Sequence, residues 1–353
     1  MREVVSHAPE PLPAPWILEE DLVIGVEYGS EEYMLRNPFA FVVMDGGEIV
    51  IYDNQPFQLR VYDGQGRFLR AFGQEGQGPT DLQRFAHLRD VGEGLFQLWG
   101  GVRPFRIQTW NLLGEWQDTQ TLPEGHPLYL RSIRHWDGDR LWTEIGEYDR
   151  SGERAWARTT IVSSTWSGTV LDTFMTHEIR PMMPIGASMA QAMMDDTPYS
   201  QFLLTSAGRA YYSRLEEDWV REYEVPGGRE ILRFHWIHEP DSIPESMAEE
   251  LSQLGSGRYQ DDIVEGVEWL REQVTMFGLG EGPEHEIWVQ RNPWNRDLIP
   301  YTIDVFSVEG RYRGRLEVPF PANLMQYRDG YLYAIGHVGE APALIRYRLQ
   351  VAR

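Results

Sequence analysis

The chain of 353 residues contains no cysteine, and this absence is the first limit on its chemistry. Without thiols the protein can form no disulfide, no thiolate-bound metal site and no lipid-modified cysteine, and it has no cysteine nucleophile. It also lacks any apolar run near the roughly 20 residues that a helix needs to cross a bilayer. HExxH, CxxC, GxSxG and P-loop lysine motifs are missing too, so the sequence predicts no catalytic residue and no transmembrane segment.

Positive charge is also scarce. Lys and Arg total 32 against 54 Asp and Glu, which gives a formal net charge of −22. Such an acidic surface repels phosphate backbones and anionic lipid headgroups, so we expect no nucleic-acid partner. The charge balance is typical of a secreted protein, or of one that docks on a basic partner.

What the chain does contain is turn chemistry between short apolar runs. Between residues 39 and 85 these runs are four to seven residues long, and clusters of Asp, Asn and Gly separate them. Gly and Asp tolerate the positive φ that tight hairpins require, so the clusters predict turns between β-strands. The runs are Phe39–Val43, Ile49–Tyr52 and Phe57–Tyr62, and a glycine-rich exit, Gly73–Gly78, follows a fourth. This meander predicts one blade of a β-propeller.

The same stretch resembles the NHL-type blade of six-bladed propellers. The matching residues are Val61-Tyr62-Asp63, Gly66-Arg67-Phe68, Phe72-Gly73, Gly76, Gly78-Pro79 and Phe85. The resemblance implies a six-bladed propeller, and members of such families are usually exported and often lipid-anchored. It therefore implies a periplasmic or secreted protein whose signal segment has been removed from this chain.

The central strand of this unit recurs along the chain. The similar runs are Glu48–Tyr52, Leu95–Trp99, Leu141–Ile145, Ala210–Ser213, Ile287–Gln290 and Leu332–Ile335. Measured from Ile49, the first three lie 46 residues apart and the last two lie 45 apart, within the roughly 40–50 residues of a propeller blade. The two longer intervals, of 69 and 77 residues, each have room for one blade and an insertion. Six runs predict six blades, and thus an all-β fold.

The two ends of the chain complement each other. The last blade runs out of sequence after its third strand, whereas Trp16–Ile24 forms an apolar run with no hairpin partner nearby. We therefore predict that Trp16–Ile24 supplies the outer strand of the last blade, which removes an exposed sheet edge. Residues 1–15 are Pro-rich and are predicted to be a disordered lead-in, and residues 16–353 a single propeller domain.

Two insertions interrupt the repeat, at about residues 171–197 and 240–277. The second has a helical pattern. The first contains six of the twelve methionines and has three interpretations: a loop over the propeller face, an adaptable surface for another protein, or a Cu(I) site with His177. On the second interpretation, the partner-binding residues are Met175, Met182, Met183, Met189, Met193 and Met194.

Few side chains suggest chemistry. His235 and His238 fall on a predicted strand, where they point to opposite faces, so we interpret them as structural and assign no metal ligand. Acidic residues near strand ends leave calcium open as the one cofactor to consider. These residues are Asp45, Asp53, Asp63, Asp90 and Glu144.

Two classes of function follow. The first is a non-catalytic binding or scaffold propeller, an accessory subunit that docks on a protein partner or on a membrane-attached complex. The alternative is a lactonase-like six-bladed hydrolase or lyase with a central calcium or zinc ion. The predicted inner strands contain few ligands for such an ion, and this favours the first class.

Overall fold

The computed structural model describes most of the chain in twelve stretches. These are residues 1–7, 14–83, 85–100, 105–122, 130–136, 140–149, 156–179, 200–214, 219–237, 276–291, 301–318 and 324–352. The contacts divide the chain into two compact units. The first comprises Met1–Trp16, Pro127–Pro319 and Ala352, and the second Ile17–His126 and Phe320–Val351.

The fold is a six-bladed β-propeller, and three of its blades lie in the second unit. Blade 1 comprises β3 (Pro38–Val43), β4 (Ile49–Asn54), β5 (Phe57–Tyr62) and β6 (Phe68–Phe72). Blade 2 comprises β7 (Phe85–Gly92), β8 (Leu95–Gly100), β9 (Arg106–Asn111) and β10 (Trp116–Thr121). Blade 6 comprises β23 (Leu324–Arg328), β24 (Tyr331–Val338), β25 (Ala341–Val351) and β2 (Trp16–Ile24).

The other three blades lie in the first unit. Blade 3 comprises β11 (Leu130–Trp136), β12 (Leu141–Asp149), β13 (Trp156–Ser164) and β14 (Val170–Ile179). Blade 4 comprises β15 (Ser200–Leu204), β16 (Ala210–Arg214), β17 (Val220–Tyr223), β18 (Glu230–Ile237) and β1 (Arg2–His7). Blade 5 comprises β19 (Met276–Glu281), β20 (Ile287–Arg291), β21 (Tyr301–Phe306) and β22 (Tyr312–Val318). The six apolar runs that predicted six blades are the second strands of the six sheets, which confirms the count.

Alternate residues of these second strands pack against different neighbours. In β4, Val50 and Tyr52 belong to the apolar core between blades 1 and 2. Ile49 and Ile51, on the opposite face, belong to the core between blades 6 and 1. From Ile49 to Tyr52 the strand is therefore apolar at every position, because both faces of its sheet are buried there.

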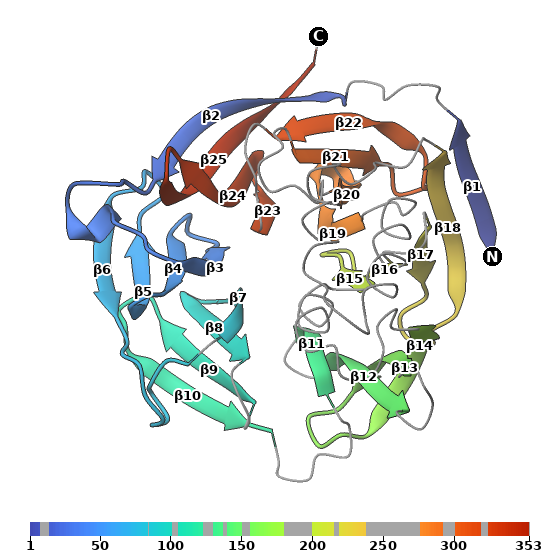
Figure 1. Ribbon diagram of the computed structural model, residues 1–353, viewed down its shortest axis with the longest axis horizontal. Coiled ribbons are helices and arrows are strands. Elements are labelled where there is room, and N and C mark those ends of the chain that lie inside the picture. Colours follow the sequence, from blue (N-terminus) through green and yellow to red (C-terminus); the bar gives the residue numbers. More distant parts are fainter. Residues whose placement is uncertain are drawn as a thin grey trace, which may run out of the picture. The chain divides into compact units, whose positions relative to one another are not determined.

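The predicted exchange of a strand between the chain ends is confirmed. β2 pairs with β25 as the outer strand of blade 6, and Figure 1 shows the two running side by side. Ile24, at the end of β2, is fully buried in the core between blades 6 and 1, together with Leu344 and Ile49. The N-terminal strand thus stabilises the blade through side-chain burial as well as through backbone pairing.

The prediction of a disordered lead-in over residues 1–15 is wrong for its first part. Arg2–His7 form β1, which pairs in parallel with β18 as a fifth strand of blade 4. Arg233 donates to the Glu3 carboxylate at 2.9 Å, and Val4 packs on the core between blades 4 and 5. A short run with two adjacent valines between polar residues is ordered here by an existing strand edge. Residues 8–13 lie outside the described residues.

The predicted insertions are described only at their edges. Residues 171–179, assigned to the first insertion, continue β14 as the outer strand of blade 3, so that boundary was placed too early. Likewise, β19 begins at Met276, inside the predicted range 240–277. Residues 180–199 and 238–275 lie outside the described part of the chain, and their predicted loop and helices stay predictions.

The turns between third and fourth strands in blades 1, 2 and 5 share one construction. Asp63 Oδ1 accepts the backbone N–H groups of Gln65 and Arg67, each at 2.9 Å. Asn111 and Ser307 accept the equivalent N–H groups in blades 2 and 5. A glycine of positive φ follows three residues after each, and its missing Cβ leaves room for the preceding blade. This explains the Asp-x-x-Gly element in the NHL resemblance physically.

Replacing Ile24 with Ala should lower the free energy of unfolding by about 2–5 kcal/mol, because it leaves a cavity between two blades. Ile17→Ala is the matched control, since Ile17 lies on the same strand and is 54% exposed. Its change should stay within about 0.5 kcal/mol. Urea denaturation of both variants tests this, and equal losses would contradict the placement of β2.

Two glycines with the same φ angle test whether the turn glycines make room for the neighbouring blade. Gly114 and Gly92 both have φ +84°, but a Cβ on Gly114 would lie 2.7 Å from a Phe72 ring carbon, whereas a Cβ on Gly92 meets nothing within 4 Å. Both Ala variants should lose roughly 1–2 kcal/mol to backbone strain. Gly114→Ala should lose about 1–3 kcal/mol more from overpacking. Thermal unfolding that ranks Gly92→Ala as the more damaging change would refute the packing role.

Candidate functional site

A buried carboxylate, that of Asp53, anchors the turn between β4 and β5. Asp53 Oδ1 accepts the N–H of Asn37 at 2.8 Å and that of Gln55 at 3.3 Å, and Oδ2 accepts the N–H of Arg36 at 3.1 Å. The guanidinium of Arg60 lies 3.8 Å from the same carboxylate. Asp53 therefore ties the turn to the segment that enters β3, and its oxygens are all engaged within the fold.

The connection from blade 1 to blade 2, residues 73–82, is equally well anchored. Asp81 accepts the N–H of Gly78 at 2.6 Å and the side-chain amide of Gln74 at 3.1 Å. Two side chains of blade 2 donate to backbone carbonyl oxygens of this connection. Arg106 donates to the carbonyl of Gly78 at 3.0 Å, and Gln108 donates to that of Pro79 at 2.8 Å. A bridge between Glu75 and Leu82, with Leu82 fully buried, completes the loop. These contacts make the connection a fixed wall.

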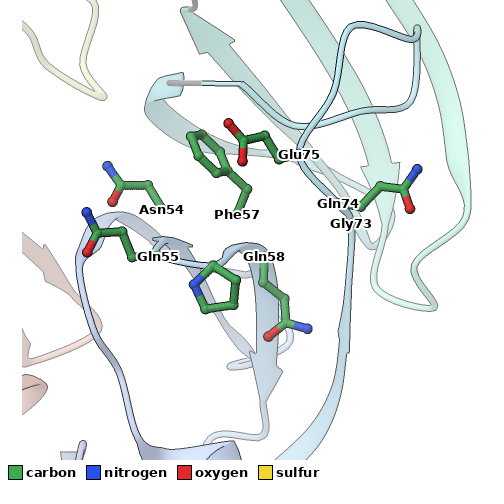
Figure 2. A pocket seen from close by; sticks show the side chains of 8 residues that line it. Asn54, Gln55, Phe57, Gln58, Gly73, Gln74 and Glu75 are labelled. Atoms are coloured by element: carbon green, nitrogen blue, oxygen red, sulfur yellow. The ribbon is translucent and has the colours of Figure 1, made fainter.

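A pocket of about 430 Å³ opens between this wall and the β4–β5 turn. The two meet because β4 ends, β5 begins and β6 ends at the same end of an antiparallel sheet. The pocket is lined by Asn54, Gln55, Pro56, Phe57, Gln58, Gly73, Gln74 and Glu75. In Figure 2 the Glu75 carboxylate points toward the Phe57 ring, while the Gln74 side chain points away.

The polar groups of the pocket have few partners inside the fold. The Asn54 side-chain oxygen is buried and accepts no hydrogen bond from the described residues. The side chains of Gln55 and Gln58 make none with those residues either, although both line the pocket. The Phe57 ring packs on the ring of Tyr52, with 6.3 Å between the two ring centres, and this contact holds it in place. The pocket thus combines an aromatic surface, unengaged amides and one carboxylate, which is suited to recognition of a polar ligand.

The pocket was not among the sequence-based predictions. The predicted partner-binding residue Met175 lies on β14, opposite Ile161 of β13. Met182, Met183, Met189, Met193 and Met194 lie outside the described residues. The structure therefore does not test the methionine surface, which stays a prediction.

The acidic residues considered for calcium do not all converge. Asp53 and Asp63 are engaged in their own turns, and Glu144 lies on β12. Asp45 and Asp90 do meet: the Asp90 carboxylate accepts the Asp45 N–H at 2.7 Å, and Arg328 pairs with both. Among the described residues, no three His, Cys, Asp or Glu side chains form a group that could hold a metal ion.

Of the two histidines considered for metal binding, the structure describes only one. His235 lies on β18 with its ring 4.0 Å from that of Trp219, and His238 is outside the described residues. The sequence analysis did not single out another histidine, His285, which follows Glu281 after a tight turn. The Glu281 carboxylate contacts His285 Nδ1 at 2.6 Å and accepts the Ser206 hydroxyl at 2.8 Å.

This Ser206–Glu281–His285 cluster resembles a catalytic triad in composition but not in arrangement. The serine and the carboxylate both approach the same ring nitrogen, and Ser206 Oγ lies 3.4 Å from it. Glu281 also accepts the backbone N–H of Ser206 at 2.7 Å, as Asp90 does for Asp45 in the other unit. The shared geometry identifies a link between neighbouring blades, in which an inner-strand carboxylate holds the first turn of the preceding blade.

The rigidity of the pocket wall depends on ionisation of Asp81. The Gln74 amide and the Gly78 N–H donate to its carboxylate and hold the pKa of Asp81 below its ordinary value. A carboxyl group with a lowered pKa stabilises the folded state above its unfolded pKa, and the contribution is lost as pH falls through the folded pKa. The wall should therefore loosen only in acid.

Replacing Asp81 with Ala should make the Gly78 amide exchange with solvent roughly tenfold faster at neutral pH, because a hydrogen bond to a charged acceptor is lost. The control is Asp118→Ala, which removes an exposed carboxylate from β10. Hydrogen exchange followed by NMR gives the comparison. An unchanged Gly78 amide, or an equal effect of both variants, would show that Asp81 does not hold the wall.

Comparison with solved structures places the fold among known propellers. A Bacteroides fragilis protein whose name describes it as exported aligns with a TM-score of 0.59 at 11% identity, covering 99% of both chains. A member of the DUF4221 family from Bacteroides vulgatus aligns at 0.56 and 7% identity, over 97% of this chain and all of the other. Virginiamycin B lyase from Staphylococcus aureus aligns at 0.51 and 11% identity, over 95% and 100%.

These identities support a shared fold and nothing finer. No protein-family model matches the chain, and no curated protein matches its sequence, so the NHL resemblance is confirmed only as far as the six-bladed propeller. The likeness to a lyase concerns the fold alone, and the hydrolase or lyase alternative stays a prediction. In the described part of the chain, no helix has the length and apolarity to span a membrane.

Proposed function

We propose that this protein is a non-catalytic binding propeller that acts outside the cytoplasm as an accessory subunit of a larger, membrane-attached assembly. It engages a protein partner through the end of blade 1. The observation that carries the proposal is the pocket itself, an open site with a fixed wall, beside which the Asn54 side-chain oxygen is buried without a donor from the described residues. Polar groups held in place before binding cost little to order when a partner arrives, which favours recognition.

Two further observations support this role. The eight described residues that line the pocket include no Ser, Thr, His, Lys or Tyr, and among them Glu75 is the one group for proton transfer. The exported protein of Bacteroides fragilis shares the fold over nearly the whole chain, which supports a location in the periplasm or beyond. The predicted methionine surface would provide a second contact.

A photo-crosslinking amino acid at Gln55 tests the proposal in cells of the native host. Gln55 is exposed and lines the pocket, whereas Glu93, the control position, is exposed and follows the end of β7. We expect one protein to be linked from position 55 and not from position 93. Its capture should fall when Asn54 and Gln58 are replaced by Ala.

The reciprocal experiment guards against chance capture. A crosslinker placed on the captured protein should in turn become linked to blade 1 of this protein. If position 55 yields no adduct, or if both positions yield the same proteins in equal amounts, the pocket is not a docking site.

A further inference from the structure

The charge of the pocket is one-sided. Among the described residues, Glu75 is the one ionisable residue in the lining, and none of the lining residues so described is Lys, Arg or His. The chain as a whole carries a net charge of −22, which raises the local concentration of cations. An anionic ligand would meet repulsion from Glu75, and the described lining residues offer it no cation, so the pocket favours a neutral or cationic group.

The hydrogen-bonding capacity narrows the choice further. The Asn54 oxygen is buried with no donor from the described residues, and the Gln55 and Gln58 amides provide two more acceptors. A guanidinium has five N–H donors and no acceptor, and an ammonium has three donors. Acceptors beside a carboxylate therefore match a basic side chain better than a hydroxyl or an amide.

The protein already uses the same combination within its own core. Arg315 donates to the Asp304 carboxylate at 2.8 Å and lies 5.1 Å from the centre of the Trp236 ring. Likewise, Arg346 donates to Asp21 at 2.6 Å and lies 4.8 Å from the centre of the Tyr331 ring. In each case a carboxylate and an aromatic face hold one guanidinium between them.

The blade 1 pocket has two of these three components. Figure 2 shows the Glu75 carboxylate pointing toward the Phe57 ring, and none of the eight lining residues is an arginine. We infer that the pocket receives a basic side chain, arginine above all, from the partner protein. Glu75 is its counter-ion, Phe57 its stacking face, and the Asn54, Gln55 and Gln58 amides accept the remaining N–H groups. This inference rests on the proposed function and identifies the chemistry of the partner.

Small probes test the inference on the full chain. N-acetyl-arginine amide and N-acetyl-citrulline amide have nearly the same shape, but only the first is charged. We expect saturable shifts of the Asn54, Gln55 and Gln58 side-chain amide signals with the arginine probe and none with citrulline. Raising the salt from about 50 to about 500 mM should weaken the binding, because the charges are exposed.

Variants assign the contacts. Glu75→Gln should weaken the arginine probe about tenfold, since it replaces a charge-assisted hydrogen bond by a neutral one. Glu93→Gln makes the same chemical change at the opposite end of a blade and should have no effect. Phe57→Leu keeps an apolar side chain and should weaken the probe by a smaller factor. Equal binding of citrulline, or wild-type affinity in Glu75→Gln, would overturn the inference.

The outcomes separate this inference from the proposed function. If Glu75→Gln leaves the crosslink from position 55 intact, the pocket binds a partner but does not take its basic side chain. If the arginine probe binds and no crosslink forms from position 55, the pocket prefers cations but is not the docking site. If the arginine probe does not bind and no crosslink forms from position 55, the end of blade 1 is not a functional surface.

Discussion

The structure depends on the burial of both faces of each central strand. In β4, Ile49 and Ile51 face one neighbouring blade while Val50 and Tyr52 face the other. In β16, Tyr211 packs toward blade 5, and Ala210 and Tyr212 toward blade 3. A sheet buried on both sides has no solvent face along its middle, so polar chemistry is displaced to the turns at its ends.

The turns then divide into those engaged in holding blades together and those that are not. Asp63, Asn111 and Ser307 fold their own outer turns against the preceding blade. Asp90 and Glu281 do the equivalent at the inner turns. At the β4–β5 turn, Asp53 instead ties the turn to the segment that enters its own blade, and the adjoining Asn54, Gln55 and Gln58 side chains line the pocket. This contrast separates a candidate binding surface from the stabilising links around it.

The sequence was most informative where burial leaves the strongest pattern. Six central strands and the partnership of β2 with β25 were predictable, because apolar runs and a strand shortage are local signals. Most of β14 was assigned to the first insertion, because Asp172, Thr173 and Thr176 interrupt its apolar pattern. β1 was missed because it is ordered by pairing with β18. The pocket could not be predicted: its residues read as ordinary turn residues, and only the three-dimensional path of the meander brings residues 54–58 to 73–75.

Compositional resemblance to chemistry can therefore mislead in this fold. Ser206, Glu281 and His285 have the residue types of a hydrolase, yet the carboxylate is engaged by the backbone N–H of Ser206, as in a second link that has no histidine. In contrast, Asn54 and Gln58 belong to no catalytic motif, but they have hydrogen-bonding capacity that the described fold leaves unused. Because unmet hydrogen-bonding groups cost free energy until a partner meets them, such groups are the better guide to binding. At the end of blade 1, one such buried atom, the Asn54 side-chain oxygen, lies in the lining of an open pocket beside the Gln55 and Gln58 side chains.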